Sequence, residues 1–207
     1  MILSHTKKFI FISVPKTAST VVRSELACFA DIQGEDSRDS YFYHHATGKK
    51  VKEYFVKKNL PWEDYYKFAF VRNPYSKMVS EYFYALKCVN NPEIKKVAPH
   101  YYEDCDRVAS KTTSFKEYVA KRMFQGMHCP CQSNWIPEDF DFIGKFENLQ
   151  EDYKTVCRNI GIPYRPLPKK NKTQHLPYTS YYDRETIHLV YEKHKTTITK
   201  YNYKFGD

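Results

Sequence analysis

The sequence contains few glycines and no long hydrophobic run. Its 207 residues include 6 Gly and 11 Pro, which excludes collagen-like and low-complexity chains. No apolar run is longer than five residues, so no helix is expected to cross a membrane. The stretch Phe9–Ile12 is too short for the hydrophobic core of a signal peptide. We therefore expect a cytoplasmic protein whose six cysteines (28, 88, 105, 129, 131 and 157) are free thiols.

Positive charge is concentrated towards the end of the chain. The sequence has 33 Lys and Arg against 24 Asp and Glu, and residues 154–204 hold eleven basic and three acidic residues. This bias favours an anionic partner such as a nucleotide, an acidic polymer or nucleic acid, although a solvated basic face would look the same. A hydrophobic content of 42% is sufficient for a core, and the length fits one domain over 1–207.

Predicted strands alternate with predicted helices. Strands are expected at 8–14, 67–71 and 140–145, and helices at 114–123, 149–160 and 183–200. Further helices begin near Ser19, after Thr47, and after Asn73, which precedes a proline suited to the first helical position. Residues 88–136 are the least informative. The alternation predicts an α/β fold with a mostly parallel central sheet flanked by helices.

A turn rich in hydroxyl groups follows the first predicted strand, which ends at Pro15. A strand that turns directly into a helix aims backbone N–H groups and the positive end of the helix dipole at one point, which favours an anion. Lys16 adds a positive charge, and hydroxyl donors come from Thr17, Ser19 and Thr20. Because this turn has no glycine, it differs from the G-x-x-x-x-G-K-[ST] loop of phosphate-binding NTPases.

A second strand, turn and helix follow at 67–82. Arg72 lies at the end of the predicted strand, where ligands bind in open α/β sheets, and its planar guanidinium suits a phosphate. A structural salt bridge is the alternative role of Arg72. Ser80 lies about two turns into the next helix. Two anion sites at neighbouring strand ends predict a ligand with two separated phosphates.

These two segments resemble motifs of a known family. Pro15–Thr20 is similar to the 5′-phosphosulfate loop of sulfotransferases that use 3′-phosphoadenylyl sulfate (PAPS), and Arg72–Ser80 is similar to their 3′-phosphate motif. Residues 142–149 and 201–205 resemble later motifs of the carbohydrate branch of sulfotransferase family 2, the heparan 2-O and chondroitin type. The resemblance is weakest over 88–131. It implies a P-loop-like three-layer domain that transfers a sulfuryl group from PAPS to a hydroxyl acceptor, with a carbohydrate as the expected acceptor.

The resemblance also implies a role for each residue of the donor site. Lys16 stabilises the charge that builds on the leaving phosphate oxygen. The 5′-phosphate is bound by the first turn, and the 3′-phosphate by Arg72 and Ser80. Lys172 and Thr173 are candidates for a flap over the 3′-phosphate. The residues of the first turn are Pro15, Lys16, Thr17, Ala18, Ser19 and Thr20. No metal is expected, because a sulfuryl group carries less charge than a phosphoryl group.

The acceptor side requires a base, because the hydroxyl loses its proton as it attacks. His45 resembles the catalytic histidine of this branch. His44 is the alternative, because the motif could also be matched one residue earlier. Gln132 and Trp135 belong to a stretch that resembles a segment of the family near the acceptor cleft. Trp135 either stacks on a ring of the ligand or belongs to the core.

Other function classes fit the sequence less well. A nucleotide kinase needs a glycine-rich loop and a metal-binding aspartate, and neither is evident. A nucleic-acid-binding module and a non-catalytic, nucleotide-binding family member are the alternatives, and no nucleic acid is expected as a partner. A zinc site from His128–Cys131 with Cys88, His100 and Cys105 is disfavoured, because the spacings fit no standard pattern.

Overall fold

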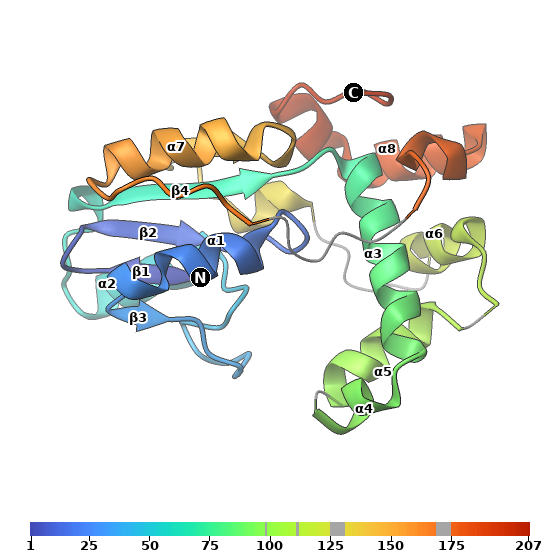
Figure 1. Ribbon diagram of the computed structural model, residues 1–207, viewed down its shortest axis with the longest axis horizontal. Helices are drawn as coiled ribbons and strands as arrows, with labels where there is room; N and C mark the ends of the chain where they lie inside the picture. The colour runs from blue at the N-terminus through green and yellow to red at the C-terminus, as the bar shows by residue number, and fades with distance from the viewer. Residues whose placement is uncertain (98, 111, 125–130, 169–174) are drawn as a thin grey trace. The chain divides into compact units, whose positions relative to one another are not determined.

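The computed structural model describes residues 1–97, 99–110, 112–124, 131–168 and 175–207. The chain divides into two compact units, and each is described here by itself. The first comprises Met1–Arg72 and Gln132–Lys170, and the second comprises Asn73–Cys131 and Asn171–Asp207. The β-sheet belongs to the first unit, whereas the described part of the second unit is helical (Figure 1).

The sheet of the first unit has five strands in the order β3–β1–β2–β4–β5. The strands are β1 (Ile2–Ser4), β2 (Phe9–Ile12), β3 (Ile32–Gln33), β4 (Tyr66–Val71) and β5 (Phe142–Lys145). β2 and β4 pair in parallel, as do β4 and β5, whereas β1 is antiparallel to both β2 and β3. The α/β prediction is confirmed, and the sheet is mixed. The sequence does not predict β1 and β3, because runs of three and two residues are too short for a periodic pattern.

One face of the sheet is aromatic. Phe9 and Phe11 of β2 and Phe68 and Phe70 of β4 alternate along their strands, so all four point to the same side and are completely buried. They form one core with α1 (Ser19–Leu26) and α7 (Leu149–Asn159), and α7 lies along β4 and β5 in Figure 1. α7 ends before Gly161, whose φ of 64° is the left-handed conformation expected after a helix.

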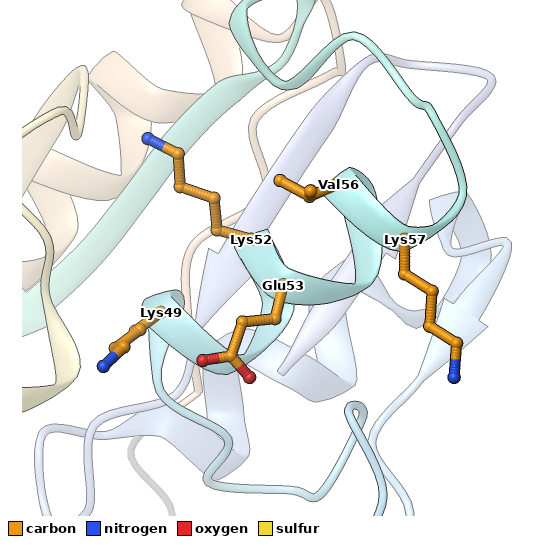
Figure 2. Close-up of a pocket in the computed structure, with 5 residues that line it drawn as sticks. All are labelled: Lys49, Lys52, Glu53, Val56 and Lys57. Carbon is orange, nitrogen blue, oxygen red and sulfur yellow. The ribbon is translucent and has the colours of Figure 1, made fainter.

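On the opposite face, Lys67 of β4 lies with its Nζ 5.8 Å from the ring centroid of Trp62 in the 3₁₀ turn η2 (Trp62–Asp64), and α2 (Gly48–Lys57) packs against η2. Phe55 of α2 is completely buried and packs edge-on against Trp62 and Tyr65, with ring centroids 5.2 and 4.8 Å away. Lys67 of β4 is also buried, and its Nζ donates to the Tyr65 carbonyl at 2.7 Å and pairs with Asp141 at 3.2 Å. The outer side of α2 carries lysines that spread away from the helix (Figure 2).

The predicted helix starts are confirmed by their caps. Thr47 Oγ1 accepts from the backbone N–H of Lys50 at 3.2 Å, which satisfies one of the unpaired donors at the start of α2. Asn73 Oδ1 accepts from Tyr75 N–H at 3.0 Å and is followed by a proline. Asp183 forms a capping box at the start of α8 (Arg184–Lys200).

The described part of the second unit contains the 3₁₀ turn η5 (Tyr178–Tyr181), which precedes α8, and four further helices. These are α3 (Pro74–Val89), α4 (Pro92–Val97), α5 (Pro99–Val108) and α6 (Phe115–Phe124). Its core is apolar, with one buried ionic group: Glu81 pairs with Lys77 and Arg122. Burial alone would raise the pKa of Glu81, but these two cations lower it to about 2. No helix within the described ranges is both long and apolar enough to cross a membrane.

The close approach of β5 to Phe70 yields a stability prediction. A Cβ on Gly144 would lie 2.4 Å from Cε1 of the buried Phe70 and 3.1 Å from Cβ of Asp152. Gly144→Ala should therefore destabilise the protein by about 1–3 kcal/mol, the usual cost of overpacking, measured as a lower urea midpoint by circular dichroism. Ser24→Ala, on the exposed side of α1, is the control without a clash. An unchanged midpoint for Gly144→Ala would contradict this packing.

Candidate donor-binding and acceptor site

The turn between β2 and α1 is shaped to bind an anion through its backbone. Lys16 and Ala18 both have the left-handed conformation, with φ of 66° and 61°, and such alternation turns successive N–H groups towards one point. Ala18 is the N-cap of α1 and has no side-chain oxygen with which to cap the helix. Within the described part of the chain, the N–H groups of residues 17–20 donate to no protein acceptor. These donors fit a phosphate or sulfate group.

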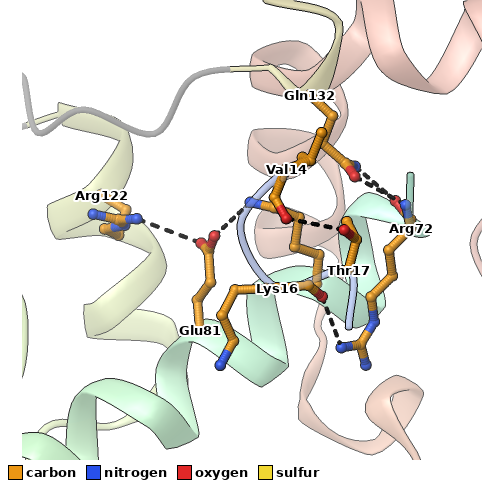
Figure 3. Close-up of polar contacts among 8 residues, drawn as sticks. Val14, Lys16, Thr17, Arg72, Glu81, Arg122 and Gln132 are labelled. Carbon is orange, nitrogen blue, oxygen red and sulfur yellow. Dashed lines mark hydrogen bonds and ion pairs between the residues drawn. The ribbon is translucent and has the colours of Figure 1, made fainter. Parts of the chain in front are cut away.

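The interior of this turn holds two buried hydroxyl groups. Thr17 is completely buried, and its Oγ1 donates to the Val14 carbonyl at 2.9 Å (Figure 3). This hydroxyl proton stabilises the turn and the Thr17 N–H remains available, while contact of Thr17 with a ligand stays a prediction. Ser13 Oγ is buried and has no partner within the described residues. Ser19 is buried and Thr20 is exposed.

Arg72 lies beside this turn, because β2 and β4 are neighbouring parallel strands. Its Nη1 donates to the Lys16 carbonyl at 3.4 Å (Figure 3), and its guanidinium lies 4.1 Å from the centroid of the Phe146 ring. Gln132 fixes the backbone of Arg72 from the other side. The Arg72 N–H donates to Gln132 Oε1 at 2.9 Å, and Gln132 Nε2 donates to the Arg72 carbonyl at 2.6 Å. The two segments predicted to bind anions are thus adjacent, because β2 and β4 are neighbours in the sheet.

His45 is held next to the same turn. Its Nδ1 lies 2.7 Å from the carbonyl oxygen of Ser13, the first residue after β2. Since a carbonyl only accepts, Nδ1 carries the proton and Nε2 keeps its lone pair. Burial lowers the pKa of His45 to about 4, and the nearby Arg23 adds to this effect. The ring is therefore neutral at pH 7, and Nε2 is able to accept a proton.

The other predicted acceptor-side residues have different environments. His44 directs Nε2 towards Asp36 Oδ1 at 3.0 Å, which occupies the nitrogen that His45 keeps available. Trp135 is buried, and its indole N–H donates to the His45 carbonyl at 2.9 Å. Gln132 is completely buried. The structure therefore shows Trp135 and Gln132 positioning His45 and Arg72, while direct contact of either residue with an acceptor stays a prediction.

The remaining predicted residues lie outside this part of the first unit. Ser80 is on α3 in the second unit and is 8% exposed. Lys172 and Thr173 lie outside the described residues, as do residues 128–130 of the disfavoured zinc site. In the described ranges, no group of three or more His, Cys, Asp or Glu is placed to hold a metal ion.

Two of the positioning interactions could not be found from sequence. The carbonyl of Ser13 has no side-chain signal, because any residue supplies one. The pairing of Gln132 with the Arg72 backbone joins residues 60 positions apart. By contrast, the spacing of four between Lys77 and Glu81 is a recognisable signal for an ion pair on one helix face.

This arrangement is an α/β protein in which a turn with available backbone N–H groups lies beside an arginine and a neutral histidine. The sulfotransferase family model matches residues 1–204, so the chain belongs to the sulfotransferase family. Members of this family are PAPS-dependent transferases, and membership implies PAPS as the sulfuryl donor. The predicted resemblance to the sulfotransferase family is thus confirmed.

Two similar proteins indicate how distant the relatives are. An uncharacterized protein of Archaeoglobus fulgidus is 29% identical over 106 residues, which cover 49% of this chain and 72% of that protein. Carbohydrate sulfotransferase 14 of Danio rerio is 22% identical over 139 residues, 60% of this chain. The match spans 36% of the length of the zebrafish protein. No solved structure matches the chain significantly.

The environment of His45 yields a spectroscopic prediction. We expect its ring to stay neutral, with the proton on Nδ1, until the pH falls towards 4, because burial disfavours the charged form. Long-range ¹H–¹⁵N correlation spectra of protein labelled at histidine measure both tautomer and pKa, and His45→Gln assigns the signal. Titration near 6.5, or a proton on Nε2, would contradict the geometry.

Proposed function

We propose that this protein transfers a sulfuryl group from PAPS to a hydroxyl group of a carbohydrate. The observation that carries the proposal is the contact of the Arg72 guanidinium with the Lys16 carbonyl, which unites two anion-binding segments in one unit. The carbohydrate acceptor is supported by the name of the zebrafish relative, carbohydrate sulfotransferase 14. We also propose a cytoplasmic location, which the free thiols of Cys28, Cys131 and Cys157 support.

The donor side of the proposal assigns its phosphates to separate groups. The N–H groups of residues 17–20 and the turn from Pro15 to Thr20 would hold the 5′-phosphate, and the buried Ser13 hydroxyl below them lacks a protein partner. Arg72 would bind the 3′-phosphate, and the roles of Ser80, Lys172 and Thr173 at this phosphate stay predictions from the sequence resemblance. When bound, PAPS supplies the sulfuryl group. Lys16 stabilises the negative charge on the phosphate oxygen that sulfur leaves.

The acceptor side of the proposal assigns the proton to His45. As the acceptor oxygen forms its bond to sulfur and the bond from sulfur to the phosphate oxygen breaks, Nε2 of His45 accepts the hydroxyl proton. The bond to Ser13 keeps the ring in the tautomer that this step requires, and Trp135 fixes the backbone of His45. His44 is the weaker candidate, because its Nε2 is paired with Asp36.

A pair of histidine variants tests the reaction. Binding of adenosine 3′,5′-bisphosphate is first measured by calorimetry. Transfer of labelled sulfate from PAPS to a panel of glycans is then measured for the same variants. His45→Asn should lower kcat about 100-fold or more, the usual contribution of a general base, while binding of the bisphosphate stays unchanged. His44→Asn is the matched control and should keep most of the activity. A fully active His45→Asn protein, or an equal loss in both variants, would contradict the role of His45.

The phosphate assignment makes a separate prediction. Arg72→Ala should weaken binding of adenosine 3′,5′-bisphosphate about tenfold or more and hardly change that of adenosine 5′-phosphate, because one charge-assisted hydrogen bond contributes about 1.5–3 kcal/mol. Lys16→Ala is the matched control: it should weaken both ligands similarly and abolish transfer. Calorimetric titration of both variants measures this. Equal losses for both ligands in Arg72→Ala would place Arg72 away from the 3′-phosphate.

A further inference from the structure

The parallel pairing of β4 with β5 places Phe146 beside Arg72. The register joins Val71 to Lys145, so the residues that follow these two positions emerge next to each other at the same edge of the sheet. The centre of the Arg72 guanidinium lies 4.1 Å from the centroid of the Phe146 ring. Both side chains are half-buried. The segment 142–149 therefore contributes a side chain to the edge at which the donor is proposed to bind.

The ring of Phe146 attracts the guanidinium without neutralising it. A cation over an aromatic face is held by the quadrupole of the ring, and a guanidinium also stacks on such rings. A carboxylate in the same place would take up N–H groups and cancel the charge that attracts a phosphate. The Lys16 carbonyl and the Gln132 amide, which also contact Arg72, are uncharged as well. These contacts orient Arg72 and preserve its attraction for an anion.

The backbone that carries the Phe146 ring is held by α7. Phe146 begins the 3₁₀ turn η4 (Phe146–Asn148), which leads directly into α7. Asp152 of α7 accepts from the backbone N–H of Lys145 at 2.6 Å through Oδ2, and from the side-chain amide of Asn148 at 2.9 Å through Oδ1. Lys145 precedes Phe146, and Asn148 ends the turn. One carboxylate therefore ties both ends of the turn to α7 and fixes the position from which the ring projects.

We propose that Phe146 is a positioning residue of the donor site, and that it holds the Arg72 guanidinium in the orientation that binds the 3′-phosphate of PAPS. The inference rests on the proposed function and deepens it by giving the segment 142–149 a role. An arginine side chain has many rotamers, and immobilising it on binding costs free energy. A ring that immobilises Arg72 beforehand reduces this cost and strengthens binding. Phe146 acts through Arg72 rather than through contact with the donor.

The experiment measures the preference for a 3′-phosphate, which is the dissociation constant of adenosine 5′-phosphate divided by that of adenosine 3′,5′-bisphosphate. Both nucleotides are titrated by calorimetry. Phe146→Leu removes the ring and keeps an apolar side chain, so it should lower this preference about three- to tenfold, in line with the loss of a cation–π contact. Phe146→Tyr keeps an aromatic ring and should retain the preference of the unaltered protein within about twofold.

A matched control and a double variant separate positioning from packing. Phe142→Leu is the same substitution on β5, where Phe142 packs against the hydrophobic core of the first unit. It should leave the preference for a 3′-phosphate unchanged, whatever its effect on the urea midpoint. In a protein that already carries Arg72→Ala, Phe146→Leu should cause no further loss of preference, because a residue that acts through Arg72 then has nothing to position.

Four outcomes would overturn the inference: an unchanged preference in Phe146→Leu, an equal fall in Phe142→Leu, an equal fall in Phe146→Tyr, or a further loss when Phe146→Leu is added to Arg72→Ala. Failure of the proposed donor site is distinguishable from these. An unaltered protein that binds both nucleotides equally would contradict the role of Arg72 at the 3′-phosphate, and this inference with it. A preference that Phe146→Leu leaves intact would contradict this inference alone.

Discussion

Parallel pairing of β2 with β4 is the constraint on which the candidate site depends. Because the two strands run in the same direction, the turns that follow them emerge at the same edge of the sheet. Arg72 therefore reaches the Lys16 carbonyl, although 56 residues separate them. The register is stabilised by buried aromatic contacts such as Phe11 with Phe68, whose ring centroids are 5.1 Å apart. The hydrophobic core of the first unit thus determines the geometry of its polar site.

The turn between β2 and α1 contains backbone strain that points to function. Two residues other than glycine, Lys16 and Ala18, adopt the left-handed conformation, which costs about 1–2 kcal/mol for each. Thr17 between them is fully buried and bonded to Val14, which compensates for part of this strain. Strained turns of this kind are concentrated at ligand sites, because an unstrained alternative would aim the N–H groups elsewhere.

The first unit links this turn to the acceptor side through its backbone. The Ser13 carbonyl, which directly follows β2, sets the tautomer of His45, and α2 begins three residues after that histidine. The turn after β2, His45 and the start of α2 are therefore parts of one continuous framework. A displacement of β2 would disturb all three at once. The buried Trp135 and Gln132 further hold this framework through bonds to the backbone of His45 and Arg72.

Local patterns in the sequence were sufficient for the three longer strands, the helix starts at Thr47, Asn73 and Asp183, and the family, because alternation, caps and short motifs are properties of neighbouring residues. β1, β3, α4 and α5 were not predicted, since they are short or lie in a stretch without clear periodicity. Only the tertiary structure decided between His44 and His45 as the histidine with an available Nε2. It also showed that the Thr17 hydroxyl donates to the Val14 carbonyl within the turn. These outcomes depend on partners far away in sequence or on backbone carbonyls, which no side-chain pattern encodes.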